Sequence, residues 1–104
     1  MKAIINGFRY DTEKAIEVGS YDYGNAGDFE EWSATLYKTP RAGRYFLAGR
    51  GGPMTMYRST SDGRNFGWGS AITPMTEEEA FDWAQEYLSP EEIETHFADM
   101  IEDA

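Results

Sequence analysis

Two helix-start signals near the C-terminus constrain the fold more than any other feature of the sequence. Thr76 and Glu79 have the T-x-x-E spacing of a capping box, in which each side chain binds the backbone N–H of the other residue. Ser89 and Glu92 repeat the spacing, with a proline at the first helical position of the second box. We therefore predict two short helices, over residues 76–88 and 90–102.

Apolar residues recur at helical spacing after each start signal. The first stripe consists of Ala80, Phe81, Ala84, Tyr87 and Leu88, and the second of Ile93, Phe97, Met100 and Ile101. Side chains at these intervals share one side of a helix. The stripes predict that both helices are amphipathic and pack one face against the rest of the chain.

The residues before the helices show strand and turn signals. Asn6-Gly7 between short apolar runs is typical of a two-residue hairpin turn. Apolar and polar residues alternate over 32–38, as in a half-buried strand. We predict strands at 16–20, 32–38, 44–48, 54–59 and 66–73, a helical turn at 12–15, loops at 21–27 and 39–43, a strand break at 49–53, and a turn around Asp62-Gly63.

The order of these elements predicts the fold class. Strands followed by helices are typical of an α+β domain. The 104 residues and the 40% hydrophobic content suffice for one compact core. We expect a single domain over residues 1–104, in which an antiparallel sheet of three to five strands, drawn from about residues 2–73, packs against the two helices.

The charge is distributed unevenly along the chain. Residues 65–104 contain eleven Asp and Glu and no Lys or Arg, whereas residues 1–64 contain all nine basic residues and eight acidic ones. The net charge of −10 disfavours direct binding to nucleic acid or to an anionic membrane. It favours a basic protein partner, or it serves solubility alone.

Few residues suit catalysis or metal binding. The chain lacks cysteine, which excludes a Cys nucleophile. Its only histidine, His96, falls in the second acidic helix and off the apolar stripe, so we expect a surface residue rather than a general base for a Ser nucleophile. Carboxylate pairs are abundant, but in so acidic a chain they arise by chance. We predict no enzymatic activity, no catalytic residue, no cofactor and no metal site. The absence of cysteine and of a signal-peptide or transmembrane pattern favours the cytoplasm.

The first predicted helix carries acidic residues in a row. Glu78, Asp82 and Glu86 follow one another at intervals of four, about 6 Å apart along the helix axis. Like charges at this spacing repel, and no basic residue relieves them. We interpret the row as a surface that binds a basic groove, and we state the hypothesis that it does so by mimicry of DNA. The predicted partner-binding residues are Asp28, Glu30, Glu31, Glu78, Asp82, Glu86, Asp99, Glu102 and Asp103.

Three segments give the chain a resemblance to a known group of proteins. They are KAIINGFRYDTEKA at the N-terminus, TLYKT followed by GRYFLAGRGGP, and SAITPMTEEEAFDWAQEYL. The sequence resembles small acidic proteins of Gram-positive bacteria and their mobile elements, some of which resemble anti-CRISPR proteins directed at type I effector complexes. The resemblance implies inhibition by occupation of the effector's DNA-binding surface, and it assigns no site residues.

Three functions therefore remain open. The first is an anti-CRISPR-like inhibitor, a monomer or weak dimer that binds a basic surface of a type I CRISPR effector complex. The second is a protein–protein adaptor domain whose acidity serves solubility and which binds through residues such as Met54, Met56 and Tyr57. The third is a small hydrolase with a concave carboxylate pair.

Overall fold

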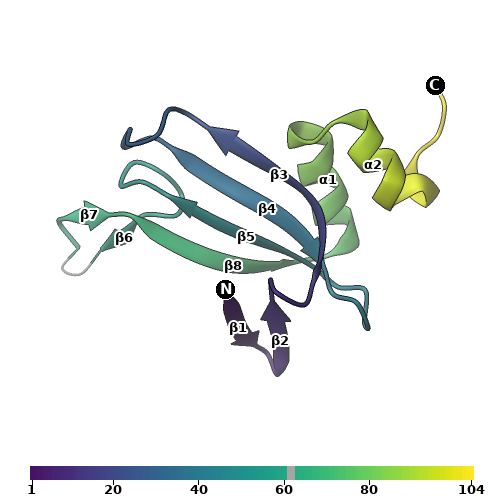
Figure 1. Ribbon diagram of the computed structural model, residues 1–104, viewed down its shortest axis with the longest axis horizontal. Helices are drawn as coiled ribbons and strands as arrows, with labels where there is room; N and C mark the ends of the chain where they lie inside the picture. Colours follow the sequence, from purple (N-terminus) through teal and green to yellow (C-terminus); the bar gives the residue numbers. More distant parts are fainter. Residues whose placement is uncertain (61–62) are drawn as a thin grey trace.

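The computed structural model describes residues 1–60 and 63–104 and confirms the predicted α+β class. The predicted turn at Asp62-Gly63 includes a residue outside the described part. The elements, shown in Figure 1, are β1 (Lys2–Ile5), β2 (Phe8–Asp11), β3 (Ile16–Tyr23), β4 (Trp32–Lys38), β5 (Tyr45–Gly51), β6 (Ser59–Thr60), β7 (Phe66–Gly67), β8 (Gly69–Met75), α1 (Glu77–Tyr87), α2 (Pro90–Phe97) and the 3₁₀ helix η1 (Ala98–Met100).

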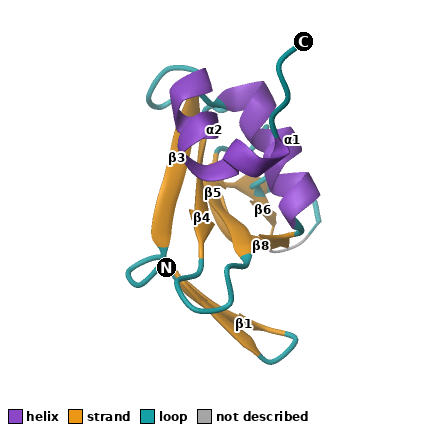
Figure 2. Cartoon of the chain, turned by 90° about the vertical axis from the view of Figure 1, so that its right-hand side faces the viewer, coloured by secondary structure: helices purple, strands orange, loops and turns teal. Residues whose placement is uncertain are grey.

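The N-terminal hairpin forms as predicted but stands apart from the main sheet. Strands β1 and β2 pair with each other, and Asn6 and Gly7 between them have φ angles of 52° and 82°. Positive φ at both central residues is typical of the type I′ turn, which Asn-Gly favours. The hairpin projects below the sheet in Figures 1 and 2.

The main sheet has four antiparallel strands in the order β3-β4-β5-β8. β4 has the predicted bounds, and the register pairs Leu36 with Leu47 and Ala34 with Gly49. β3 and β8 are the edge strands, and the register of β3 against β4 shifts around Val18, which marks a β-bulge. β3 continues through Tyr23, so the loop predicted from residue 21 begins later.

Both helices begin where the capping boxes predicted. The Thr76 N–H donates to Glu79 Oε1 (2.9 Å) and the Glu79 N–H donates to Thr76 Oγ1 (3.1 Å); Ser89 and Glu92 make the equivalent bonds. The end of α2 was predicted wrongly. The helix ends at Phe97 rather than at residue 102, and the chain tightens into η1 before it becomes extended at Ile101.

The core lies between the helices and one face of the four-stranded sheet. α1 packs on β3, β5 and β8, and α2 packs on β3 (Figure 2). The buried residues of this core are Val18, Ala34, Leu36, Tyr45, Leu47, Tyr57, Ala80, Ala84 and Phe97. The rings of Tyr45 and Phe97 stack with their centroids 5.3 Å apart. On the opposite face, the N-terminal hairpin covers Phe46 with the ring of Tyr10, also at 5.3 Å.

The glycine-rich segment after Ala48 does not break the strand, contrary to the prediction. β5 runs through Gly51, and its glycines leave room for a segment that folds back over the sheet. A β-carbon at Gly49 would overlap the ring of Tyr57. A β-carbon at Gly69 would overlap the backbone carbonyl oxygen of Tyr57. These positions exclude side chains because Tyr57 packs directly on the strands.

One further predicted element and one predicted cap were wrong. Residues 54–58 form successive turns rather than a strand, because the hydroxyl and N–H of Thr55 both donate to the carbonyl of Gly52 (2.8 and 3.1 Å). Residues 12–15 form a single turn, as predicted, but Asp11 rather than Thr12 caps it. The backbone carbonyl of Asp11 accepts hydrogen bonds from the N–H groups of Lys14 and Ala15. The Asp11 carboxylate accepts a hydrogen bond from the Glu13 N–H.

The last predicted strand is divided and longer. β7 and β8 are separated at Trp68, and β8 extends past the predicted end to Met75. Pro74 lies within β8, which an edge strand tolerates because it needs no hydrogen bonds on its outer side. Within the described ranges, the helices are all too short or too polar to cross a membrane.

Candidate functional site

The predicted acidic row lies on the solvent side of α1. Glu78, Asp82 and Glu86 are exposed, whereas Ala80 and Ala84 on the opposite side of the helix are fully buried. Helical geometry alone determines this arrangement, because residues four apart share one side of a helix. The first-turn position of Glu78 is favourable, since the helix N-terminus is partially positive. Asp82 and Glu86 lie beyond that effect.

An aromatic cavity of about 400 Å³ adjoins the row. It lies between α1, the sheet and the segment that folds back over the strands. Its lining consists of Trp32, Leu47, Met56, Tyr57, Ala71, Thr73, Trp83, Glu86 and Tyr87. The ring of Tyr87 contacts Trp83 at 5.0 Å and Trp32 at 5.4 Å between centroids. Glu86 belongs to both the acidic row and the aromatic cavity.

The electrostatics of the aromatic cavity favour positive charge. Glu86 supplies a carboxylate at an aromatic wall, and the faces of Trp and Tyr rings attract cations. Removal from water, and then the neighbouring Glu86 carboxylate, raises the pKa of the Tyr87 hydroxyl. Burial raises the pKa of Tyr57, with a smaller contribution from Tyr87. Both hydroxyls therefore stay neutral at physiological pH, and the carboxylate is the only charged group in the lining.

The acidic residues of the β3–β4 connection belong to a separate loop, which leads directly into Trp32 of the aromatic cavity but is not part of the row on α1. Figure 1 shows that connection at the left end of the view, and α2 with the C-terminus at the right end. Asp28 and Glu30 are exposed there. The side chain of Glu31 is only 16% exposed: it accepts from the Gly27 N–H (2.8 Å) and lies 3.8 Å from the Arg50 guanidinium. Glu31 therefore closes the loop rather than presenting a free charge.

The remaining predicted acids lie beyond α2. Asp99 is in η1, and Glu102 and Asp103 are in the extended tail; all three are exposed. Because the helix ends at Phe97, Glu102 and Asp103 do not belong to a last helical turn, where carboxylates would be unfavourable. The nine predicted residues thus occupy three places: the row on α1, the β3–β4 connection and the C-terminal segment. Glu86 of the row lines the aromatic cavity, and Glu102 of the C-terminal segment lines another cavity of about 360 Å³.

Sequence reasoning did not predict the aromatic cavity. Its rings come from β4, the fold-back segment and α1, and the sequence indicated only that aromatic residues form the core. One signal was present, since Met56 and Tyr57 were singled out as possible contacts. Met56 is 67% exposed and lines the cavity, whereas Tyr57 is 9% exposed and forms its inner wall.

Neither metal chemistry nor known proteins add to this geometry. Within residues 1–60 and 63–104, no group of three His, Cys, Asp or Glu residues is arranged to hold a metal ion. Comparison of the chain with protein-family models, with curated proteins and with solved structures gives no match. The candidate site therefore rests on its own residues.

Proposed function

We propose that this protein binds a basic protein surface through the acidic row of α1 and the aromatic cavity beside it. The observation that carries the proposal is the position of Glu86, which lies at once in an exposed acidic row and in the lining of the aromatic cavity. A Lys or Arg side chain of the partner would enter the cavity, where ring faces and a carboxylate both attract it. The rest of the row would contact neighbouring basic residues.

The partner surface that best fits this arrangement is one that otherwise holds DNA. Such surfaces carry rows of Lys and Arg, and an acidic row on a helix offers them negative charge in place of phosphates. With the resemblance noted above, we propose a cytoplasmic, anti-CRISPR-like inhibitor of a type I effector complex that acts as a monomer or weak dimer. Inhibition by occupation requires stoichiometric binding and no catalysis.

The test is a mobility-shift competition with a purified type I surveillance complex and its target duplex at two salt concentrations. We expect the protein to co-migrate with the complex and to block DNA binding, less so at high salt. The variant Glu78→Gln/Asp82→Asn/Glu86→Gln should weaken inhibition by about tenfold or more, because charge complementarity accelerates association.

A matched control removes the same charges elsewhere. Glu13→Gln/Glu17→Gln/Asp22→Asn replaces two Glu and one Asp that are exposed but lie outside the row. Inhibition should survive in this variant. If both triple variants lose inhibition equally, net charge rather than the row is responsible; if the protein does not bind the complex at all, this effector is not the target.

A second function, that of an adaptor domain, is favoured by one observation. Met54 and Met56 are 64% and 67% exposed, and flexible Met side chains adapt to many apolar partners. An adaptor that used these residues would bind its partner at high salt and would lose binding in Met54→Ser, which leaves the lining of the aromatic cavity unchanged. Retention of binding in that variant, with loss in the acidic triple variant, would favour the inhibitor.

A further inference from the structure

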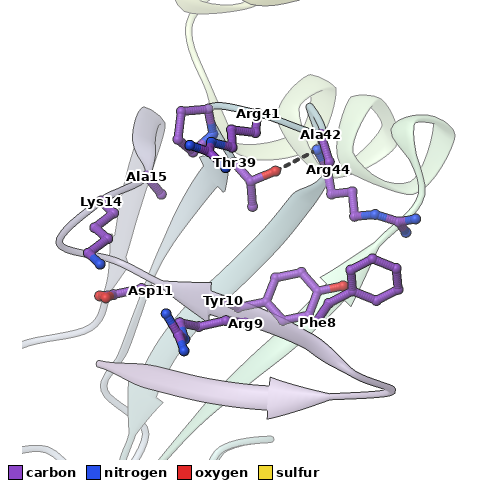
Figure 3. A pocket seen from close by; sticks show the side chains of 11 residues that line it. Phe8, Arg9, Tyr10, Asp11, Lys14, Ala15, Thr39, Arg41, Ala42 and Arg44 are labelled. Carbon is purple, nitrogen blue, oxygen red and sulfur yellow. Dashed lines mark hydrogen bonds between the residues drawn. The ribbon is translucent and has the colours of Figure 1, made fainter.

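A second cavity, of about 450 Å³, lies between the N-terminal hairpin and the β4–β5 turn. It is separate from the aromatic cavity, because it borders the hairpin that covers Phe46, and Phe46 points away from the helices. Figure 3 shows Lys14 on one side of the cavity, Arg44 with Phe8 on the other, Arg41 above and Arg9 below. We call it the basic cavity.

The charges around the basic cavity are unbalanced. Four of the nine Lys and Arg of the chain line it, with Asp11 as the only acid. Asp11 is already engaged, since its carboxylate accepts from the Glu13 N–H (3.0 Å) and lies 3.9 Å from the Lys2 amine. Within the described ranges, none of the four lining cations has an ion pair. In a chain with 19 acidic residues, this leaves a local positive potential that a ligand can satisfy.

The walls of the basic cavity are held in place before any ligand binds. The Arg44 N–H donates to Thr39 Oγ1 (2.9 Å) and the Thr39 N–H donates to the Arg44 carbonyl (2.8 Å), which fixes the turn. The Arg44 guanidinium lies 3.9 Å from the centre of the Phe8 ring. Tyr10 is 4% exposed and packs on Phe46. A preformed site saves the ligand the free energy of ordering it.

We propose that the basic cavity binds a small phosphate-bearing molecule with an apolar part, of the nucleotide class. Guanidinium groups bind phosphate oxygens in pairs of parallel hydrogen bonds, and Arg9, Arg41 and Arg44 supply them. The ring of Phe8, which is 43% exposed, offers the apolar part a wall. The volume lies in the range of about 300–1,000 Å³ that small-molecule sites occupy. The net charge of −10 repels a long nucleic acid more strongly than a small anion, because a small anion can lie wholly beside the four cations of the cavity.

The experiment is isothermal titration calorimetry of the full chain with AMP, ATP and inorganic phosphate. We expect saturable 1:1 binding of the nucleotides, weaker binding of phosphate alone, and loss of affinity as salt is added. Arg41→Gln and Arg44→Gln should each weaken nucleotide binding by about tenfold or more, because each removes a charged hydrogen-bond donor.

Arg58→Gln is the matched control. Arg58 also stacks on an aromatic ring, at 4.3 Å from the centre of Phe66, but it does not line the basic cavity. Its variant should bind nucleotides as the wild type does. Arg41 is exposed and has no hydrogen bond or ion pair with residues 1–60 or 63–104, so Arg41→Gln should keep the wild-type circular dichroism spectrum and report on binding alone.

Three outcomes would overturn the proposal. They are no binding of any nucleotide at millimolar concentration, phosphate bound as tightly as AMP, and equal loss of binding in Arg58→Gln. Self-association that disappears in the Arg41 and Arg44 variants would instead assign the cavity to the acidic helices of a second copy. Because the basic cavity and the acidic row share no residue, each proposal can fail without the other.

Discussion

The aromatic cavity and the basic cavity lie on opposite faces of the same sheet, and they differ in both charge and support. The first has one carboxylate in its lining and rests on the core between α1 and the sheet. The second has four cations and rests on a hairpin that reaches the sheet through Tyr10 and Phe46. The uneven charge along the sequence therefore gives the folded chain two sites, one that favours cationic ligands and one that favours anionic ligands.

The largest expected effects come from removing one buried ring on each face. Phe97→Ala removes a buried ring under the helices, and Tyr10→Ala removes a buried ring under the hairpin. Each should lower the free energy of unfolding by about 3–5 kcal/mol, because each leaves a cavity. Urea denaturation measures the loss. NMR chemical shifts should locate the damage in α2 and its neighbours for the first variant and in β1–β2 for the second.

The two faces of the sheet are not independent if Phe97→Ala and Tyr10→Ala change the chemical shifts of the same residues. Shifts in α1 and α2 as large as those in the hairpin for Tyr10→Ala would show that the two faces form one cooperative site. A Tyr10→Ala variant with intact helices but without nucleotide binding would instead sharpen the distinction.

A smaller loss of stability is expected from a change at the N-cap of α1, the helix that carries the acidic row. Thr76→Ala should cost about 1 kcal/mol, because it removes the side chain that caps the helix. The hydrogen bond from the Thr76 N–H, and then that with its side chain, lowers the pKa of Glu79. The stability linked to Glu79 is therefore present above its unfolded pKa and is lost as pH falls through the folded value.

Glu79→Gln isolates the pH-dependent part of this effect. Gln keeps an acceptor for the capping box but does not titrate. Urea unfolding at pH 7 and at about pH 3, on either side of the usual Glu pKa, should show a smaller acid-induced loss in this variant than in the wild type. An identical loss in both proteins would mean that the capping carboxylate contributes nothing to acid sensitivity.

The smallest effect is a gain in stability. Asp82 lies between two acidic residues of the row, so Asp82→Asn relieves two like-charge contacts and should raise the unfolding free energy by about 0.5 kcal/mol. Asp and Asn have similar helix propensities, so the change isolates charge. Thermal unfolding at low salt measures the gain, with Glu30→Gln as a control outside the helices. No gain would mean that solvent already screens the row.

Local signals in the sequence predicted what local interactions determine. The capping boxes located both helix starts, alternation gave the bounds of β4, and Asn6-Gly7 gave the hairpin. The acidic row was predicted as exposed because helical geometry depends only on spacing. The fold class follows from the order of the elements and is confirmed.

Contacts between distant residues explain what the sequence did not reveal. Local propensity predicts a strand break at Gly49 and Gly51. Both glycines lie in β5, and the side chains of Tyr57 and Thr55 from the fold-back segment occupy the space where their β-carbons would be. The end of α2 carries no stop signal such as glycine. Both cavities combine residues from separate segments, so their linings could not be read from spacing. The contact of Glu31 with Arg50 of β5 is likewise one between separate segments.

The edges of the four-stranded sheet bear on how the protein behaves when it is concentrated. Free strand edges invite other chains to add to them and begin aggregation. On β3, a bulge around Val18 and the charges of Glu17 and Asp22 interrupt a regular edge. On β8, Pro74 lacks the N–H that an added strand would need. The sheet is therefore protected against growth by strand addition on both sides.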